Sequence, residues 1–167
     1  MTPATATATA AAPAARLLHR PVHTGPAFWG PGDHYTFLVT GEESGGAYFA
    51  MEAIVPPGGG PPPHIHTRED ETFYVLEGEI EFVLGSDVVT ATAGAFVNVP
   101  RGTVHCFRNT GTQGARLILT FTPAGIEHFF LETLEAAPNV PAETPDNVEE
   151  VAARYVEAAP RHGLEFD

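Results

Sequence analysis

The sequence predicts an all-β domain, built as an antiparallel sandwich or a closed barrel. Eight short segments rich in Val, Ile, Phe, Tyr and Thr follow one another at near-regular spacing, each bounded by Gly, Pro, Asn or Asp. No long helical pattern separates these segments, which argues against a parallel sheet. The 17 glycines and 16 prolines among the 167 residues suit a chain with many tight turns.

The eight predicted strands lie in residues 34–122, which we therefore assign to the β domain. Their bounds are His34–Thr40, Ala47–Val55, Glu71–Glu77, Glu79–Leu84, Val88–Thr92, Ala95–Val99, Val104–Asn109 and Ala115–Thr122. The run Gly85, Ser86 and Asp87 predicts a hairpin turn between two of them.

The segments on either side of this domain have different patterns. Residues 1–15 consist mainly of Ala, Thr and Pro and predict a disordered tail, because such a composition buries too little apolar surface. Residues 16–33 predict a loop or arm that packs Phe28 and Trp29 against the domain. Residues 123–167 predict a helical extension.

Two short helices are expected in this extension. The first has an apolar face formed by Ile126, Phe129, Phe130 and Leu134. For the second helix, Asp146 and Glu149 have the spacing of a capping box, and Pro160 marks the end. Its apolar face consists of Val148, Val151, Ala152, Tyr155 and Ala159.

The charge of the chain argues against two classes of partner. A formal net charge of -13, with only eight Lys and Arg, argues against binding to nucleic acid or to an anionic membrane surface, because both favour clustered positive charge. No apolar run approaches the roughly 20 residues of a membrane span. The single cysteine, Cys106, forms no disulfide within the chain, so we expect a cytoplasmic protein.

Two segments carry the residues with chemical potential. The first segment reads Gly58, five residues, His64, Ile65, His66, four residues, Glu71, six residues and Gly78. The second reads Gly94, five residues, Pro100, Arg101, Gly102, two residues, His105, three residues and Asn109.

The alternation of side chains in extended backbone brings these residues together. His64 and His66 point to the same side, while Ile65 points away. Glu71 opens the next strand, and His105 lies on a strand that the second segment supplies. We call the set His64, His66, Glu71 and His105 the donor cluster and predict that it binds a metal ion. Asp70 is an alternative carboxylate ligand to Glu71.

The donor types indicate which metal the site takes. Three imidazoles and one carboxylate suit one divalent transition metal ion, such as Mn, Fe, Co, Ni, Cu or Zn, better than Ca or Mg, which prefer oxygen ligands. Four protein ligands leave one or two positions of a five- or six-coordinate ion open, as Lewis-acid or oxygen chemistry requires.

Aromatic residues with inward parity predict a cavity beside the donor cluster. The predicted pocket residues are Phe49, Met51, Phe73, Phe107, Phe121 and His128. Of these, His128 is expected to reach the barrel mouth as an acid or base from the first helix. Cys106 and Arg108 have the opposite parity, which predicts a core filler and a surface residue, respectively.

The two segments resemble the paired motifs of the cupin superfamily, with every fixed position filled by the expected residue type. The resemblance spans His34–Thr122 and implies a cupin-type double-stranded β-helix, or jelly-roll barrel, followed here by short C-terminal helices. Within the superfamily, the chain resembles short bacterial single-domain cupins related to quercetin 2,3-dioxygenase. This implies oxygenolytic cleavage of a metal-chelated flavonol, enol or phenol, with Glu71 as catalytic proton acceptor.

The resemblance leaves more than one function open, because the cupin fold hosts several activities. The alternatives are a non-catalytic, metal-stabilised module that binds a small molecule, and a metal-dependent isomerase. The expected partners are a small organic molecule, such as an aromatic one, and O2. Cupins commonly dimerise, so a homodimer in which residues 16–32 form an exchanged arm is also expected.

Overall fold

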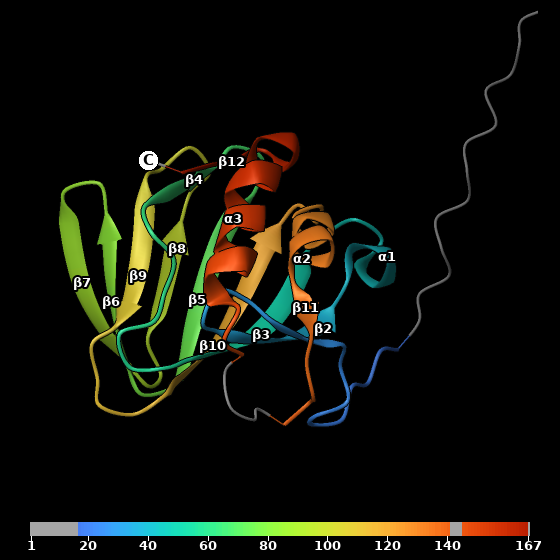
Figure 1. Cartoon of the computed structure of the whole chain (residues 1–167), viewed down its shortest axis with the longest axis horizontal. Coiled ribbons are helices and arrows are strands. Elements are labelled where there is room, and N and C mark those ends of the chain that lie inside the picture. The colour runs from blue at the N-terminus through green and yellow to red at the C-terminus, as the bar shows by residue number, and fades with distance from the viewer. Residues whose placement is uncertain (1–16, 141–144, 167) are drawn as a thin grey trace, which may run out of the picture.

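The computed structural model describes residues 17–140 and 145–166 (Figure 1). The predicted disordered tail, residues 1–15, lies outside the described residues. Strands dominate the described chain, and every strand pair is antiparallel. The predicted all-β class is therefore confirmed. Within these residues no helix is long and apolar enough to span a membrane.

The strands form two sheets. The seven-stranded sheet has the order β11 (Glu135–Ala136), β1 (Ala27–Trp29), β2 (His34–Val39), β3 (Phe49–Val55), β10 (Ala115–Thr122), β5 (Asp70–Glu77) and β8 (Phe96–Val99). The five-stranded sheet has the order β12 (Leu164–Phe166), β4 (His64–His66), β9 (His105–Asn109), β6 (Glu79–Leu84) and β7 (Asp87–Thr92). All eight predicted strands are present, with ends that differ by at most two residues.

Four short strands were not among the predicted ones. The predicted loop around Phe28 and Trp29 contains β1, in which Phe28 pairs with Tyr35 of β2. The other three are β4, β11 and β12, each of two or three residues. Segments this short contain too few residues to show an alternating pattern, so only their partners define them as strands.

Within residues 17–140 and 145–166, four helical segments accompany the sheets. They are α1 (Gly41–Ser44), α2 (Glu127–Thr133), α3 (Val148–Ala158) and the 3-10 helix Ala159–His162. Both predicted helices are present as α2 and α3, whereas α1 was not predicted. In Figure 1, α2 and α3 lie beside one another on the same side of the sheets.

The predicted capping box of α3 is wrong. The helix begins one residue later than expected, with Asn147 at the N-cap and no hydrogen bond from its side chain to the helix. The Asn147 amide instead donates to Glu135 Oε2 at 2.8 Å. Glu135 also accepts a hydrogen bond from Arg154 at 2.7 Å, which ties α3 to β11.

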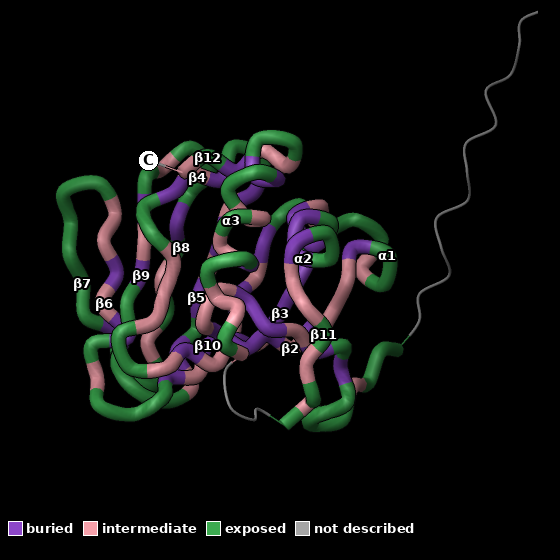
Figure 2. Tube along the Cα trace, viewed as in Figure 1, coloured by how far each residue is buried: buried purple, intermediate pink, exposed green. Residues whose placement is uncertain are grey.

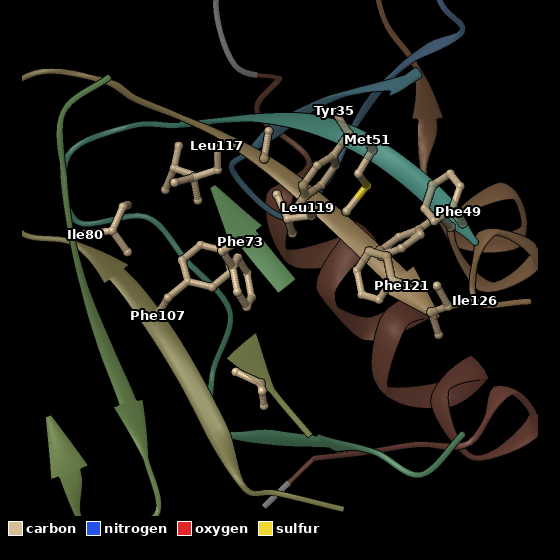
Figure 3. Close-up of a cluster of buried hydrophobic side chains, with 14 of the residues drawn as sticks. Tyr35, Phe49, Met51, Phe73, Ile80, Phe107, Leu117, Leu119, Phe121 and Ile126 are labelled. Atoms are coloured by element: carbon tan, nitrogen blue, oxygen red, sulfur yellow. The ribbon is translucent and has the colours of Figure 1, made fainter. Parts of the chain in front are cut away.

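The core lies between the two sheets and beneath α2. Side chains from both sheets meet in a single cluster, which Figure 3 shows running from Ile80 and Phe107 to Phe49 and Ile126. Figure 2 shows buried residues along β2, β3, β5 and β10, whereas the edge strand β7 is largely exposed. The alternation of burial on β10 confirms the inward and outward parity expected of its strand pattern.

The arm between β3 and β4 positions the first histidines. Gly58 N donates to Asn109 O at 2.8 Å, and Asn109 N donates to Gly59 O at 3.0 Å. Gly60, at φ 127°, passes so close to β9 that a Cβ there would lie 2.1 Å from Phe107 O. Only glycine fits this crossing, which delivers β4 to the edge of β9.

Candidate metal centre

The structure brings the four residues of the donor cluster together. Each side chain offers one donor atom, and these four atoms all lie within 4.8 Å of one another. The histidines come from β4 and β9, where His64 pairs with His105, and the carboxylate comes from β5 of the other sheet. All four residues are at most 6% exposed, so the donors converge in the interior.

Backbone carbonyl groups orient two of the imidazoles. His64 Nδ1 lies 2.9 Å from Pro62 O, and His105 Nδ1 lies 3.0 Å from Thr103 O. A carbonyl oxygen only accepts, so Nδ1 is the donor in both rings. Each ring is thereby turned with Nε2 toward the cluster, the arrangement that histidine ligands of metal ions commonly have.

Glu71, not Asp70, supplies the carboxylate of the cluster. Glu71 Oε2 lies 2.9 Å from His105 Nε2 and 3.5 Å from His66 Nε2. Asp70 points the other way and binds Arg101, accepting from its backbone N at 2.9 Å and from its guanidinium at 2.9 and 3.0 Å. This ion pair holds the pKa of Asp70 well below its usual range.

Burial keeps two of the imidazoles neutral. Burial, with the nearby His105, lowers the pKa of His64 to about 4, and burial likewise lowers the pKa of His66 well below its ordinary value. Burial also acts to lower the pKa of His105, but its hydrogen bond to Glu71 and the charge of that carboxylate raise it overall. Burial raises the pKa of Glu71. Neutral imidazoles are the form that binds metal.

A second carboxylate lies behind His66. Glu69 Oε2 is 3.9 Å from His66 Nδ1, both atoms are buried, and neither has a hydrogen-bond partner among the described residues. Glu69 itself is 2% exposed. A carboxylate in this position can orient a histidine ligand. The sequence pattern did not predict this placement of Glu69.

The donor set therefore fits a divalent transition metal ion. Three imidazoles and one carboxylate converge, two of the rings have Nδ1 already engaged by backbone, and no Lys or Arg competes for Glu71 within hydrogen-bonding distance. The set could hold the ion through three nitrogens and one oxygen.

A small cavity opens beside the donor cluster, and we call it the donor cavity. It has a volume of about 50 Å³. Its walls are formed by Tyr35, Met51, Pro61, His64, His66, Glu71, Phe107, Leu119, Phe121, Phe129, Phe130, Tyr155, Leu164 and Phe166. Apart from the three donors, this wall is almost entirely apolar and aromatic.

The predicted pocket residues fall into three groups. Met51, Phe107 and Phe121 lie on the wall of the donor cavity. Phe49 and Phe73 are fully buried in the core but do not line it. His128 is exposed on α2 and is not a residue of this cavity wall either. The helical repeat turns Phe129 and Phe130 inward and leaves His128 in solvent.

The C-terminal segment closes one side of the site. In β12, Leu164 pairs with His66 and Phe166 pairs with His64, and Thr67 N donates to Gly163 O at 2.8 Å. Leu164 and Phe166 both line the donor cavity, as does Tyr155 of α3. None of these three was predicted to line a pocket, because their contacts join residues about a hundred positions apart.

The fold and the site thus define the class of protein: a β-barrel with three inward histidines and one inward glutamate. Residues 51–121 match the family model described as a cupin domain. The match covers β3 to β10, which carry all four residues of the donor cluster.

Two curated proteins are similar to this part of the chain. A germin-like protein of Oryza sativa is 36% identical over 94 residues, which are 52% of this chain and 44% of that protein. Quercetin 2,3-dioxygenase of Bacillus subtilis is 27% identical over 100 residues, 59% of this chain and 29% of that protein. The chain thus spans less than half the length of either relative.

The solved structures show the same fold. A Thermotoga maritima protein described as a predicted oxalate decarboxylase superimposes with a TM-score of 0.58 at 22% identity, over 64% of this chain and 99% of that one. At this level of identity the likeness concerns the fold alone.

Proposed function

We propose that this chain is a metal-dependent dioxygenase that cleaves a metal-chelated flavonol, enol or phenolic substrate. The observation that carries the proposal is the position of the donor cluster, which is buried and faces an aromatic cavity. The likeness to a quercetin 2,3-dioxygenase supports the same reaction class. The substrate and O2 are the two reactants, and O2 is the oxidant.

The histidines and Glu71 would hold the ion. A bound divalent transition metal supplies Lewis acidity, which favours the ionised form of a chelated enol or phenol, together with redox chemistry toward O2. Glu71 is suited to accept the proton that the substrate hydroxyl loses, because its carboxylate both belongs to the donor cluster and lines the donor cavity.

The aromatic wall would orient the substrate. Met51, Phe121 and Phe130 present apolar surface to the donor cavity. Such a wall binds a flat organic molecule by burial of apolar area and keeps water from the reacting carbon atoms. A polar sugar, by contrast, would leave its hydroxyl groups unpaired against this wall.

Oxygen uptake tests the proposal. The metal content of the purified protein is measured first, and an oxygen electrode then follows O2 consumption with quercetin as the probe. We expect uptake that depends on the protein and disappears in His66→Ala, which lacks one donor. His128→Ala is the matched control, because His128 is exposed and lies outside the donor cavity.

The alternatives give different results in the same experiment. Ligand-induced heat or a raised melting temperature without O2 uptake would identify a binding module instead of a dioxygenase. Product formation without O2 would identify an isomerase. A metal-loaded protein that consumes no O2 with flavonol, phenolic or diketone probes contradicts the proposal. The homodimer and the cytoplasmic location stay predictions.

A further inference from the structure

A second cavity lies next to the donor cavity, and we call it the Asp33 cavity. Its volume is about 130 Å³, larger than that of the donor cavity. The loop before β2, the glycine and proline arm before β4, α3 and the end of β12 enclose it. Val156 of α3 is 62% exposed and lines it, so the cavity reaches the protein surface on that side.

Asp33 is the only acidic residue on the wall of this cavity. The residue is 3% exposed, and Oδ2 accepts a hydrogen bond from the Tyr35 hydroxyl at 3.1 Å. Oδ1 is buried and has no hydrogen-bond partner among the described residues. A hydrogen bond from Gly30 N to Asp33 O, at 2.8 Å, fixes the backbone of the loop. A buried acceptor without a partner lowers the stability of the fold, and a ligand that donates a hydrogen bond to this oxygen would remove that penalty.

A second polar group without a partner lines the same cavity. The Tyr155 hydroxyl is buried; it lies near Thr133, whose own hydroxyl donates to Phe129 O at 2.7 Å, and it has no hydrogen bond of normal geometry to the residues that the structure describes. A phenol hydroxyl both donates and accepts. The remaining wall is mostly apolar, with Pro31, Pro61 and Phe166 among its residues. One acceptor and one donor in an apolar wall match a ligand hydroxyl, which donates to the carboxylate and accepts from the tyrosine.

The two cavities are neighbours with a common wall. Tyr35, Pro61, Tyr155 and Phe166 line both of them. A rigid molecule that spans both would place one end at the donor cluster and the other at Asp33. Burial raises the pKa of Asp33 to about 7, so near neutral pH both its ionised and its protonated forms can bond a hydroxyl group.

We propose that Asp33 and Tyr155 form, in the Asp33 cavity, a recognition site for a substrate hydroxyl group that does not chelate the metal. This proposal rests on the proposed function, which identifies the part of the substrate that chelates the metal. The substrate class is thereby narrowed to elongated, flat phenols that carry a hydroxyl group at the end distant from the chelating oxygens. Asp33 and Tyr155 determine specificity and take no part in the chemical step.

Two flavonols that differ in a single hydroxyl group test the proposal. Galangin lacks the hydroxyl on the distal ring, and kaempferol carries one there. Both are titrated into the purified protein by calorimetry without O2, so that binding is measured without turnover. We expect the wild type to bind kaempferol more tightly by about tenfold, the upper range for one net hydrogen bond.

The variants decide which residues cause this preference. Asp33→Asn and Tyr155→Phe should each reduce the preference to less than about twofold while binding galangin as the wild type does. Asp87→Asn is the matched control, because Asp87 is exposed at the start of β7. Thermal unfolding of each variant confirms that it is folded, and Tyr155→Phe provides the second test if Asp33→Asn does not fold.

The outcomes separate this proposal from the proposed function. Equal affinity of the wild type for the two flavonols, no binding of either, or an unchanged preference in both variants overturns the recognition site. A preference that the variants abolish, in a protein that never consumes O2, supports the recognition site and contradicts the dioxygenase. O2 uptake without any preference for kaempferol over galangin supports the dioxygenase and contradicts the recognition site.

Discussion

The two halves of the barrel interior differ in chemistry although the same strands build both. On β5, Glu71 and Phe73 are successive inward residues, and on β9 the same holds for His105 and Phe107. Glu71 and His105 face the donor cluster, whereas Phe73 and Phe107 pack against Phe82 with ring centroids 4.9 and 5.9 Å away. One step of two residues along β5 therefore separates Glu71 from the packed core, whereas on β9 the next inward residue, Phe107, contacts both the core and the donor cavity.

This difference shows how the fold divides its tasks. The aromatic half is fully packed, and its side chains contribute stability through burial. The donor half contains buried polar atoms without protein partners, which reduces stability unless a ligand or an ion binds them. Substitutions in the two halves should therefore have separable effects, on folding in one and on binding in the other.

The largest effect on stability is expected in the aromatic half. Phe82→Ala should lower the free energy of unfolding by about 3–5 kcal/mol, because it leaves a cavity in a fully buried cluster. Urea unfolding measures the change. Phe96→Ala is the control: Phe96 is 63% exposed on β8, so its removal should cost little. Equal losses in the two variants would contradict the division of the interior.

Asp33 gives the next largest effect, and it depends on pH. The carboxyl titrates at about 7 in the folded chain against an ordinary 3.8, so between these values the folded state binds more protons and stability falls as pH rises. Ionisation of Asp33, which lies near the Tyr35 and Tyr155 hydroxyls, should lower the free energy of unfolding by roughly 4 kcal/mol at pH 8. Asp33→Asn should remove most of this fall.

Thermal unfolding of the wild type and of Asp33→Asn from pH 4 to pH 8 provides the measurement. The difference between the two proteins should grow with pH and favour the variant above pH 7. His64 contributes with the opposite sign, since its lowered pKa makes stability fall as pH decreases from 6.5 toward 4. A constant difference between the two proteins over the whole range would contradict the assignment to Asp33.

A third effect concerns metal affinity. His66→Ala should lower the affinity for Ni or Co by at least about a hundredfold, equivalent to about 2.7 kcal/mol, since losing a direct ligand costs more than losing an outer partner. Calorimetric titration with the metal measures it. Phe82→Ala, if still folded, should bind metal with an affinity close to that of the wild type. An unchanged affinity in His66→Ala would show that the ion binds elsewhere.

The smallest effect is expected for the carboxylate behind His66. Glu69→Gln should lower metal affinity by about tenfold, because the neutral amide orients the imidazole less strongly than a carboxylate. The same titration measures this change, and Glu165→Gln is the control, since Glu165 is exposed on β12. If both variants bind metal equally well, Glu69 has no positioning role.

The sequence predicts the central part of this molecule better than its edges. The strands from His34 to Thr122 and the four donors follow from alternation and spacing, because strand parity alone determines which side chains share a face. The sequence left Asp70 open as an alternative ligand to Glu71. Its hydrogen bond to Arg101 in the structure shows that Asp70 lies outside the donor cluster. Local pattern and tertiary structure agree in this region.

The closure of the site could not be predicted from local pattern. Tyr155 and Phe166 reach the cavities because β12 adds to the edge of β4, a pairing of residues about a hundred positions apart. A strand of three residues is too short to show an alternating pattern in the sequence. Asp33 lies in a loop, and nothing in the sequence distinguishes it from an exposed loop residue, whereas the structure shows that it is buried. Burial of an isolated polar group is a property of the whole fold.

The location of a bound ion tests the central claim most directly. Crystals of the protein grown with cobalt, measured at the cobalt absorption edge, would show the ion in an anomalous difference map. We expect one peak at about 2.0–2.2 Å from the imidazole nitrogens of His64, His66 and His105 and from a Glu71 oxygen. No peak among these four side chains, or a peak bound by other residues, would contradict the account.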